Sequence, residues 1–212
     1  MFDSTRFFIF LSAALLLAIA PGPGMLYVLA RSLAGGKREG ILSAAGTFLG
    51  GMVHVVAAAL GLSIVLAESA AAFAAVKYVG AAYLCFLGVG MILDARKDRG
   101  GLSVEPTLAR PVRNPLWQGM ATEVLNPKTA LFYLSFIPQF VDRSGGHVFA
   151  QFVILGAISV SMNTTADLLV IALAGPLGEK IRSSAKFRRR QRTVTGAIMI
   201  GLGTYLVAGE AK

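Results

Sequence analysis

Cysteine is almost absent from this chain, because its 212 residues include only Cys85. A single thiol excludes an internal disulfide, a dithiol redox pair and a zinc site built from cysteines. No H-E-x-x-H motif occurs, and Gly35-Gly36-Lys37-Arg38 lacks the spacing and the hydroxyl of a phosphate-binding loop. We therefore expect no nucleotide, no other cofactor and no resident metal.

Charged residues are also scarce. They make up 15% of the chain, whereas hydrophobic residues make up 55%, and the mean hydropathy is +0.68. This balance is too apolar for a soluble domain of this length and indicates an integral membrane protein. A helix that spans a bilayer needs about 20 mostly apolar residues. The stretches that meet this requirement are residues 7–29, 41–66, 70–93, 116–141, 149–174 and 193–209.

The basic residues are sorted between alternate loops. In a soluble protein the net charge of +9 would suggest a nucleic-acid partner, but this sorting indicates membrane topology, so no nucleic acid is expected. The odd-numbered loops carry Arg31, Lys37, Arg38, Arg96, Lys97, Arg99, Arg110, Arg113, Lys180, Arg182, Lys186, Arg188, Arg189, Arg190 and Arg192. The other side has Arg6, Lys77, Arg143 and Lys212. By the positive-inside rule, the odd loops are cytoplasmic and both termini face outward.

The polar stretch 94–115 divides the chain into two sets of three predicted helices, 1–93 and 116–212. The predicted fold is therefore an all-α polytopic membrane protein, a single transmembrane domain of six helices over 1–212. Because an odd number of helices precedes the second half, any repeat of the first half is inverted in the membrane.

Weak internal similarity supports such a repeat. An offset of 106 residues aligns Pro21 with Pro127 and Tyr27 with Tyr133. Glycines are abundant in the apolar stretches, and Gly46-x-x-x-Gly50 is a close-packing motif. Packing within one chain is the favoured interpretation of these glycine faces, and a homodimer interface is the alternative.

Two helix-breaking segments lie half a chain apart inside predicted membrane helices. They are Pro21-Gly22-Pro23-Gly24 and Asn126-Pro127-Lys128. Proline removes a backbone donor, and hydrocarbon cannot satisfy the carbonyl that this frees. Broken helices near the middle of a membrane are typical of transporter substrate sites. Helices one and four are therefore predicted to be discontinuous, and the half-helix after the first break is predicted to attract a carboxylate.

Ionisable groups inside a membrane are costly, so each needs a partner or a function. Glu123 and Asn126 are three residues apart, and Asn163 and Asp167 are four apart, so each pair shares a helix face. Both faces are predicted to line a cavity, where Asp167 or Glu123 binds an ammonium group or exchanges a proton. A plain ion pair between Glu123 and Lys128 is the alternative. The lone His54 is interpreted as a packing residue.

The chain resembles the LysE/RhtB family of amino-acid exporters over nearly its whole length. The motifs are A-P-G-P at 20–23, K-Y-V-G-A-A-Y-L-C-F-L-G at 77–88, N-P-K-T-A-L-F-Y-L-S-F-I-P-Q-F at 126–140, and Asp167-Leu168-Leu169. The resemblance implies a bacterial inner-membrane exporter of amino acids or related metabolites, driven by the proton-motive force. In that membrane, the orientation given by the positive-inside rule puts both termini in the periplasm.

The predicted function is export of amino acids or related zwitterions by proton antiport. The expected partners are the amino-acid substrate, protons and the membrane lipids around the protein. The candidate substrate-binding residues are Pro21, Gly22, Pro23, Gly24, Tyr27, Asn126, Pro127 and Asn163. The candidates for proton coupling or ammonium binding are Asp167, Glu123 and Lys128. The alternatives are divalent-cation efflux, a non-transporting membrane scaffold and an intramembrane enzyme. An enzyme is not expected, because no nucleophile is paired with a base and no catalytic metal motif occurs.

Overall fold

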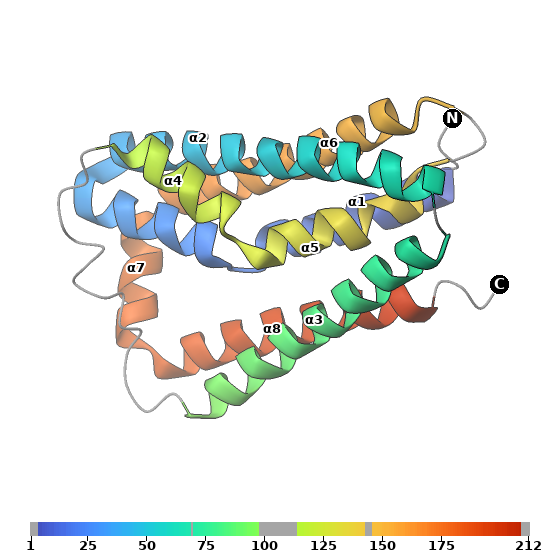
Figure 1. Cartoon of the computed structure of the whole chain (residues 1–212). Helices are drawn as coiled ribbons and strands as arrows, with labels where there is room; N and C mark the ends of the chain where they lie inside the picture. The colour runs from blue at the N-terminus through green and yellow to red at the C-terminus, as the bar shows by residue number, and fades with distance from the viewer. Residues whose placement is uncertain (1–3, 69, 98–113, 143–145, 209–212) are drawn as a thin grey trace.

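The computed structural model describes residues 4–68, 70–97, 114–142 and 146–208. Within these residues the regular structure is helical and no strand forms, which confirms the all-α prediction. The helices are α1 (Ser4–Ile19), α2 (Pro23–Glu68), α3 (Ala70–Lys97), α4 (Pro115–Val124), α5 (Pro127–Ser135), the 3-10 helix η2 (Ile137–Phe140), α6 (Val148–Ala172), α7 (Ala174–Ser183) and α8 (Ala185–Ala208). The start of α1 and the end of α8 lie at the same end of the molecule (Figure 1).

Helix α2 consists of two helices that meet at Gly36, whose backbone is non-helical at φ 75° and ψ −173°. The chain reverses direction there, so the two parts of α2 run side by side (Figure 1). Arg31 and Glu39 form an ion pair across the reversal. The polar segment expected between residues 29 and 41 is thus helical on both sides of this one glycine.

Both predicted helix breaks are confirmed. The chain leaves the helical conformation at residues 20–22, between α1 and α2, and at 125–126, between α4 and α5. Pro127 is the first residue of α5, where its missing N–H costs no helical hydrogen bond. The Asn126 side chain caps α5 by accepting a hydrogen bond from the Lys128 backbone N–H at 3.1 Å. The local sequence therefore ends one helix and starts the next within two residues.

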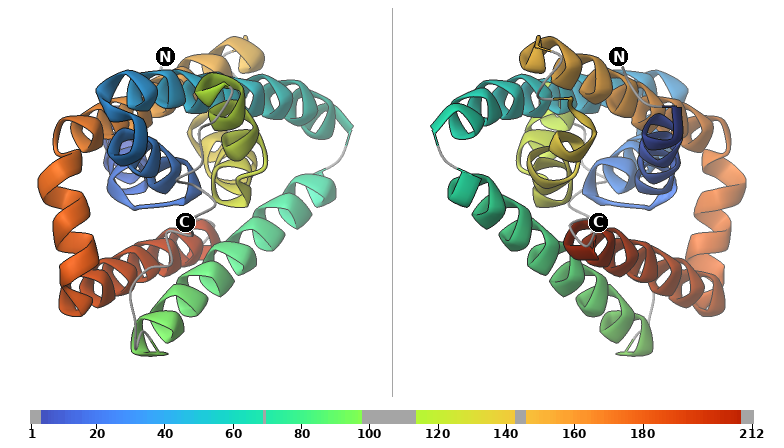
Figure 2. Two further views of the ribbon diagram at one scale, coloured as in Figure 1. Left: turned by 90° about the vertical axis from the view of Figure 1, so that its left-hand side faces the viewer. Right: turned by 90° about the vertical axis from the view of Figure 1, so that its right-hand side faces the viewer.

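Glycines allow close approach of two helix pairs. An added methyl group at Gly50 would lie 2.7 Å from the Met120 carbonyl oxygen of α4, and one at Gly46 would also overlap the α4 backbone. In the pair α3 and α8, a methyl group on Gly88 or on Gly196 would lie 2.5 Å from the other's carbonyl oxygen. Figures 1 and 2 show α3 and α8 lying along each other. The interpretation of these glycines as packing faces within one chain is confirmed.

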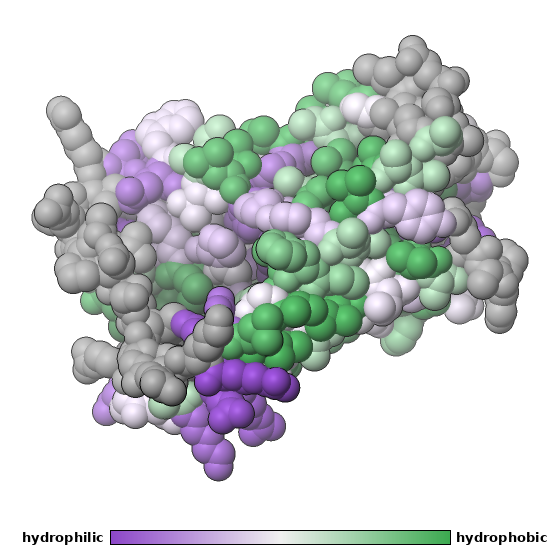
Figure 3. Space-filling model, turned by 60° about the horizontal axis from the view of Figure 1, so that its bottom comes forward, coloured by the Kyte–Doolittle hydropathy of each residue, from purple (hydrophilic) through white to green (hydrophobic). Residues whose placement is uncertain are grey.

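The apolar core lies where α1, α5, α6 and α8 meet. Its largest members include Phe10, Phe132, Phe136, Phe152 and Leu206, all fully buried. Outside this core, large apolar side chains face outward, and Figure 3 shows them across the middle of the surface, with hydrophilic residues gathered towards one end. A surface of this kind is suited to contact with lipid tails.

By length and composition, three helical stretches in the described part of the chain could cross a membrane, over Pro23–Gly61, Ala74–Arg96 and Val148–Ala172. The first of these includes the reversal at Gly36. Helix α1 is a shorter apolar helix. The stretches predicted at 7–29 and 116–141 are each divided by a break into pieces below the length of a full span. Two of the six predicted membrane helices, the first and the fourth, are therefore each made of two shorter helices in the structure, which meet at the breaks beside Pro21 and Pro127.

Candidate functional site

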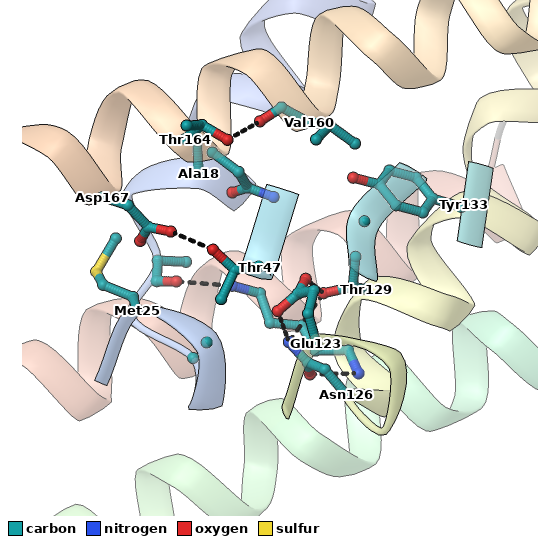
Figure 4. A pocket seen from close by; sticks show the side chains of 16 residues that line it. Ala18, Met25, Thr47, Glu123, Asn126, Thr129, Tyr133, Val160, Thr164 and Asp167 are labelled. Atoms are coloured by element: carbon teal, nitrogen blue, oxygen red, sulfur yellow. Dashed lines mark hydrogen bonds between the residues drawn. The ribbon is translucent and has the colours of Figure 1, made fainter. Parts of the chain in front are cut away.

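The two helix breaks meet at a cavity inside the helical bundle (Figure 4). Four parts of the chain line it: the end of α1 with the start of α2, the second part of α2, the α4–α5 junction, and α6. The lining residues are Ala18, Ala20, Gly22, Gly24, Met25, Thr47, Gly51, Glu123, Asn126, Lys128, Thr129, Tyr133, Val160, Asn163, Thr164 and Asp167. Its free space of about 30 Å³ has room for one or two water molecules. Binding of a larger solute therefore requires the walls to move.

Lys128 joins the second break to the first. Its ammonium group donates hydrogen bonds to the carbonyl oxygens of Leu17 at 3.1 Å and Ala20 at 2.6 Å. Pro21 has no N–H to offer the Leu17 carbonyl, four residues earlier in α1, so Lys128 supplies the missing donor. Gly22 leaves room for this side chain, because an added methyl group there would lie 3.2 Å from Lys128 Cδ. A cation at the carboxyl end of α1 also has a favourable interaction with the helix dipole.

Glu123 has the complementary position at the other side of the first break. Its carboxylate accepts hydrogen bonds from the Thr129 hydroxyl at 2.7 Å and from Asn126 Nδ2 at 3.2 Å. An added methyl group at Gly24 would overlap this carboxylate, so Glu123 lies against the amino end of α2. The half-helix end predicted to attract a substrate carboxylate thus already faces a carboxylate of the protein.

Glu123 and Lys128 do not form the direct ion pair that was the alternative interpretation. Within the described residues, the Lys128 ammonium group bonds to backbone carbonyls and Glu123 bonds to Thr129 and Asn126. Both charges face the same cavity without a direct contact. Neutral groups and the carboxyl end of α1 hold the Lys128 ammonium group. Neutral groups and the amino end of α2 hold the Glu123 carboxylate.

Asp167 is 6% exposed and lies on the opposite wall, in α6. Its Oδ2 accepts a hydrogen bond from the Thr47 hydroxyl at 3.0 Å (Figure 4). Oδ1 makes no hydrogen bond to a described residue. Asp167 therefore has an unused acceptor at the cavity, whereas both oxygens of Glu123 have donors.

His54 lies outside the cavity lining. Its Nε2 is 2.9 Å from the Glu123 carbonyl oxygen, the carbonyl that Pro127 cannot bond four residues later. Because a carbonyl only accepts, Nε2 is assigned as the protonated nitrogen. The Asn126 backbone N–H also donates to this carbonyl, at 3.0 Å, so His54 adds a second donor at the break, in keeping with a packing role.

The structure brings most of the sequence-predicted site residues together. Gly22, Gly24, Asn126 and Asn163 line the cavity with the three ionisable residues, whereas Pro21, Pro23 and Pro127 shape the backbone without lining it. Tyr27 also lies elsewhere, because its hydroxyl is 3.0 Å from the Pro115 carbonyl oxygen and 3.1 Å from Gln118 Oε1, at the start of α4.

Sequence reasoning missed Thr47, Thr129 and Tyr133 as cavity residues. Threonines and tyrosines are common in apolar helices, and only the facing of each helix distinguishes a lining residue from a packing residue. The proximity of Thr129 to Asn126, one turn away, was the one available signal.

No three His, Cys, Asp or Glu side chains gather into a potential metal site anywhere in the described ranges. Glu123 and Asp167 therefore belong to no such cluster there.

A second, larger hollow of about 620 Å³ lies beside the first break. Ile19, Ala20 and Pro21 form one wall, and α7 and α8 contribute basic residues that include Lys180 and Arg190. Ala20 lines both hollows, so the first break separates them.

Comparison with known proteins gives consistent matches along the chain. Residues 15–210 match the LysE type translocator family. An uncharacterized membrane protein of Pseudomonas aeruginosa is 35% identical, covering 98% of this chain and 94% of that protein. Leucine efflux proteins of Klebsiella pneumoniae and Salmonella typhimurium are 28% and 27% identical, over 97% and 95% of this chain and 96% and 94% of theirs. No solved structure matches. These matches point to a transporter rather than an enzyme, and the chain belongs to the LysE type translocator family.

Proposed function

We propose that this protein exports amino acids or closely related zwitterions across the bacterial inner membrane, in exchange for protons. The observation that carries the proposal is the cavity at which two interrupted helices meet, with Asp167 on the facing wall. The names of the leucine efflux relatives support a neutral amino acid as the cargo class.

Asp167 is the proposed site of coupling. It is buried, faces the cavity and keeps one carboxylate oxygen without a donor among the described residues. A carboxylate in this position can bind either the substrate ammonium group or a proton, and the two compete for the same charge. Such competition couples the outward movement of substrate to the inward movement of protons.

Alternating access is proposed to involve the two halves of the chain as inverted three-helix repeats. Helix α3 packs on α8, and the first break packs on the second, so each half contacts its counterpart. Rocking of one half against the other would open the cavity from either side. The arrangement of basic residues supports cytoplasmic odd loops and periplasmic termini.

Counterflow in proteoliposomes tests this function. The purified protein is reconstituted with unlabelled leucine inside, and uptake of labelled leucine is measured over a range of pH. The wild type is expected to exchange leucine at a pH-dependent rate, and Asp167→Asn is expected to lose the pH dependence.

Asp94→Asn is the matched control, because Asp94 is exposed near the end of α3. It is expected to behave as the wild type. An unchanged pH profile in Asp167→Asn would remove Asp167 from the coupling mechanism, and absence of exchange for every amino acid in the wild type would contradict amino-acid export.

A further inference from the structure

The Tyr133 hydroxyl is an unexplained polar group at the cavity. Tyr133 of α5 is fully buried and lines the cavity, yet its hydroxyl has no hydrogen-bond partner among the residues that the structure describes. Figure 4 shows the ring at one end of the site with its oxygen directed inward, on the side opposite Asp167. A phenylalanine would fill the same space without a polar atom to satisfy.

The Ser159 hydroxyl is a second buried polar group of this kind. Ser159 of α6 is 1% exposed, and its Oγ also lacks a hydrogen-bond partner in the described part of the chain. Ser159 and Asn163 both lie close to the Tyr133 hydroxyl. The Asn163 amide lines the cavity and makes no side-chain hydrogen bond to the residues that the structure describes.

Buried hydroxyl groups in native proteins nearly always have a partner, because leaving one unpaired loses the hydrogen bonds it made to water. The Tyr133 hydroxyl and the Asn163 amide line the cavity, and the Ser159 hydroxyl lies close to Tyr133. These three groups therefore indicate that another molecule completes them. All three side chains can donate, and none carries a charge. They suit an acceptor with several lone pairs.

The residues are spaced regularly along one face of α6. Ser159, Asn163 and Asp167 follow one another at intervals of four, so neighbours are roughly 6 Å apart along the helix axis. One interval of four residues separates the Asn163 amide from the Asp167 carboxylate. An α-amino acid has its ammonium and carboxylate groups on one carbon and, with a hydrogen bond of about 2.9 Å at each end, spans such an interval.

We propose that Tyr133, with Ser159 and Asn163, binds the carboxylate group of the substrate through neutral donors, while Asp167 takes the ammonium group. This proposal rests on the proposed function and adds the orientation of the cargo. It also explains how the site holds a carboxylate when Glu123 already lies at the amino end of α2 and Lys128 is bonded to α1.

Binding to detergent-solubilised variants tests the proposal, with leucine and leucinamide as probes. Leucinamide keeps the ammonium group and the side chain but has no carboxylate. Affinity is measured from the concentration dependence of the thermal unfolding midpoint. In the wild type, leucine is expected to bind more tightly than leucinamide.

Tyr133→Phe is expected to weaken leucine binding about tenfold, the loss of one hydrogen bond to a charged group, and to leave leucinamide binding unchanged. Ser159→Ala is expected to act in the same direction, and Tyr83→Phe, outside the cavity, is the control. The unfolding midpoint without ligand should not fall in Tyr133→Phe, because the hydroxyl has no bond to lose.

Equal leucine affinity in the wild type, Tyr133→Phe and Ser159→Ala would overturn the carboxylate site while leaving amino-acid export intact. Equal losses for leucine and leucinamide would also overturn it, because the hydroxyl would then act on the cavity as a whole. Absence of binding by any amino acid in the wild type would instead overturn the proposed function, and the orientation with it.

Discussion

The Lys128 ammonium group donates a 3.1 Å hydrogen bond to the carbonyl oxygen of Leu17, 111 residues away in the chain. That carbonyl has no helical partner, because Pro21 lacks the N–H that would reach it. The proline that breaks the first helix thus creates the acceptor, and the residue after the second proline supplies the donor. The two breaks stabilise each other, which locates both at one site.

Lys128→Met should destabilise the protein. Two buried carbonyls lose their ammonium donor, and an unpaired buried acceptor costs about 1–3 kcal/mol, so we expect a loss of about 2 kcal/mol or more. The thermal unfolding midpoint in detergent measures the effect.

Lys37→Met is the control for this change, because Lys37 is exposed beside the Gly36 reversal. It should leave the midpoint close to that of the wild type. Equal midpoints for the two variants would show that solvent or another group satisfies the α1 carbonyls as well as Lys128 does.

Gly24→Ala should disturb the first break. Its methyl group would overlap the Glu123 carboxylate, which must then move from Thr129 and Asn126. Overpacking of this kind costs about 1–3 kcal/mol, and leucine exchange should fall together with the unfolding midpoint. In Gly90→Ala the new methyl group meets no atom within 4 Å, so exchange and stability should be retained. A fully active Gly24→Ala protein would contradict the observed packing.

Gly36→Ala should destabilise the reversal within α2. At φ 75° and ψ −173° the backbone has a conformation that side chains other than glycine rarely adopt, and the strain is about 1–3 kcal/mol. Gly61→Ala, within a regular part of the same helix and with open space around it, is the comparison. If both alanine variants unfold at the wild-type temperature, the two parts of α2 do not need this conformation.

Cysteine labelling should reveal the orientation in the membrane. In a Cys85→Ala background, Gly146→Cys lies just before α6 and Ser183→Cys at the end of α7, at opposite ends of the molecule (Figure 1). A membrane-impermeant maleimide added to spheroplasts should label Gly146→Cys only, and both after lysis. Labelling of Ser183→Cys in intact spheroplasts would reverse the topology inferred from the basic loops.

The membrane class, the helical fold and both breaks could be predicted from local sequence. Apolar length identifies membrane helices, and proline interrupts a helix wherever it falls. The identity of the Lys128 partner could not be predicted, because the competing acceptors Glu123 and the α1 carbonyls are equally plausible for a lysine in sequence. The choice between them depends on how closely α5 approaches α1 beside Gly22, which is a property of packing.

Prolines 21 and 127 by themselves decide that two helices are interrupted, because a missing N–H acts within one turn and needs no distant contact. The same local chemistry marks Glu123, Lys128 and Asp167 as groups that need a reason to be buried. Only the tertiary structure decides that the interruptions meet, that Thr47 bonds to Asp167, and that Tyr133 brings a hydroxyl with no partner among the described residues to the cavity. Those relationships join residues far apart in the chain, and the facing of each helix in the packed bundle determines them.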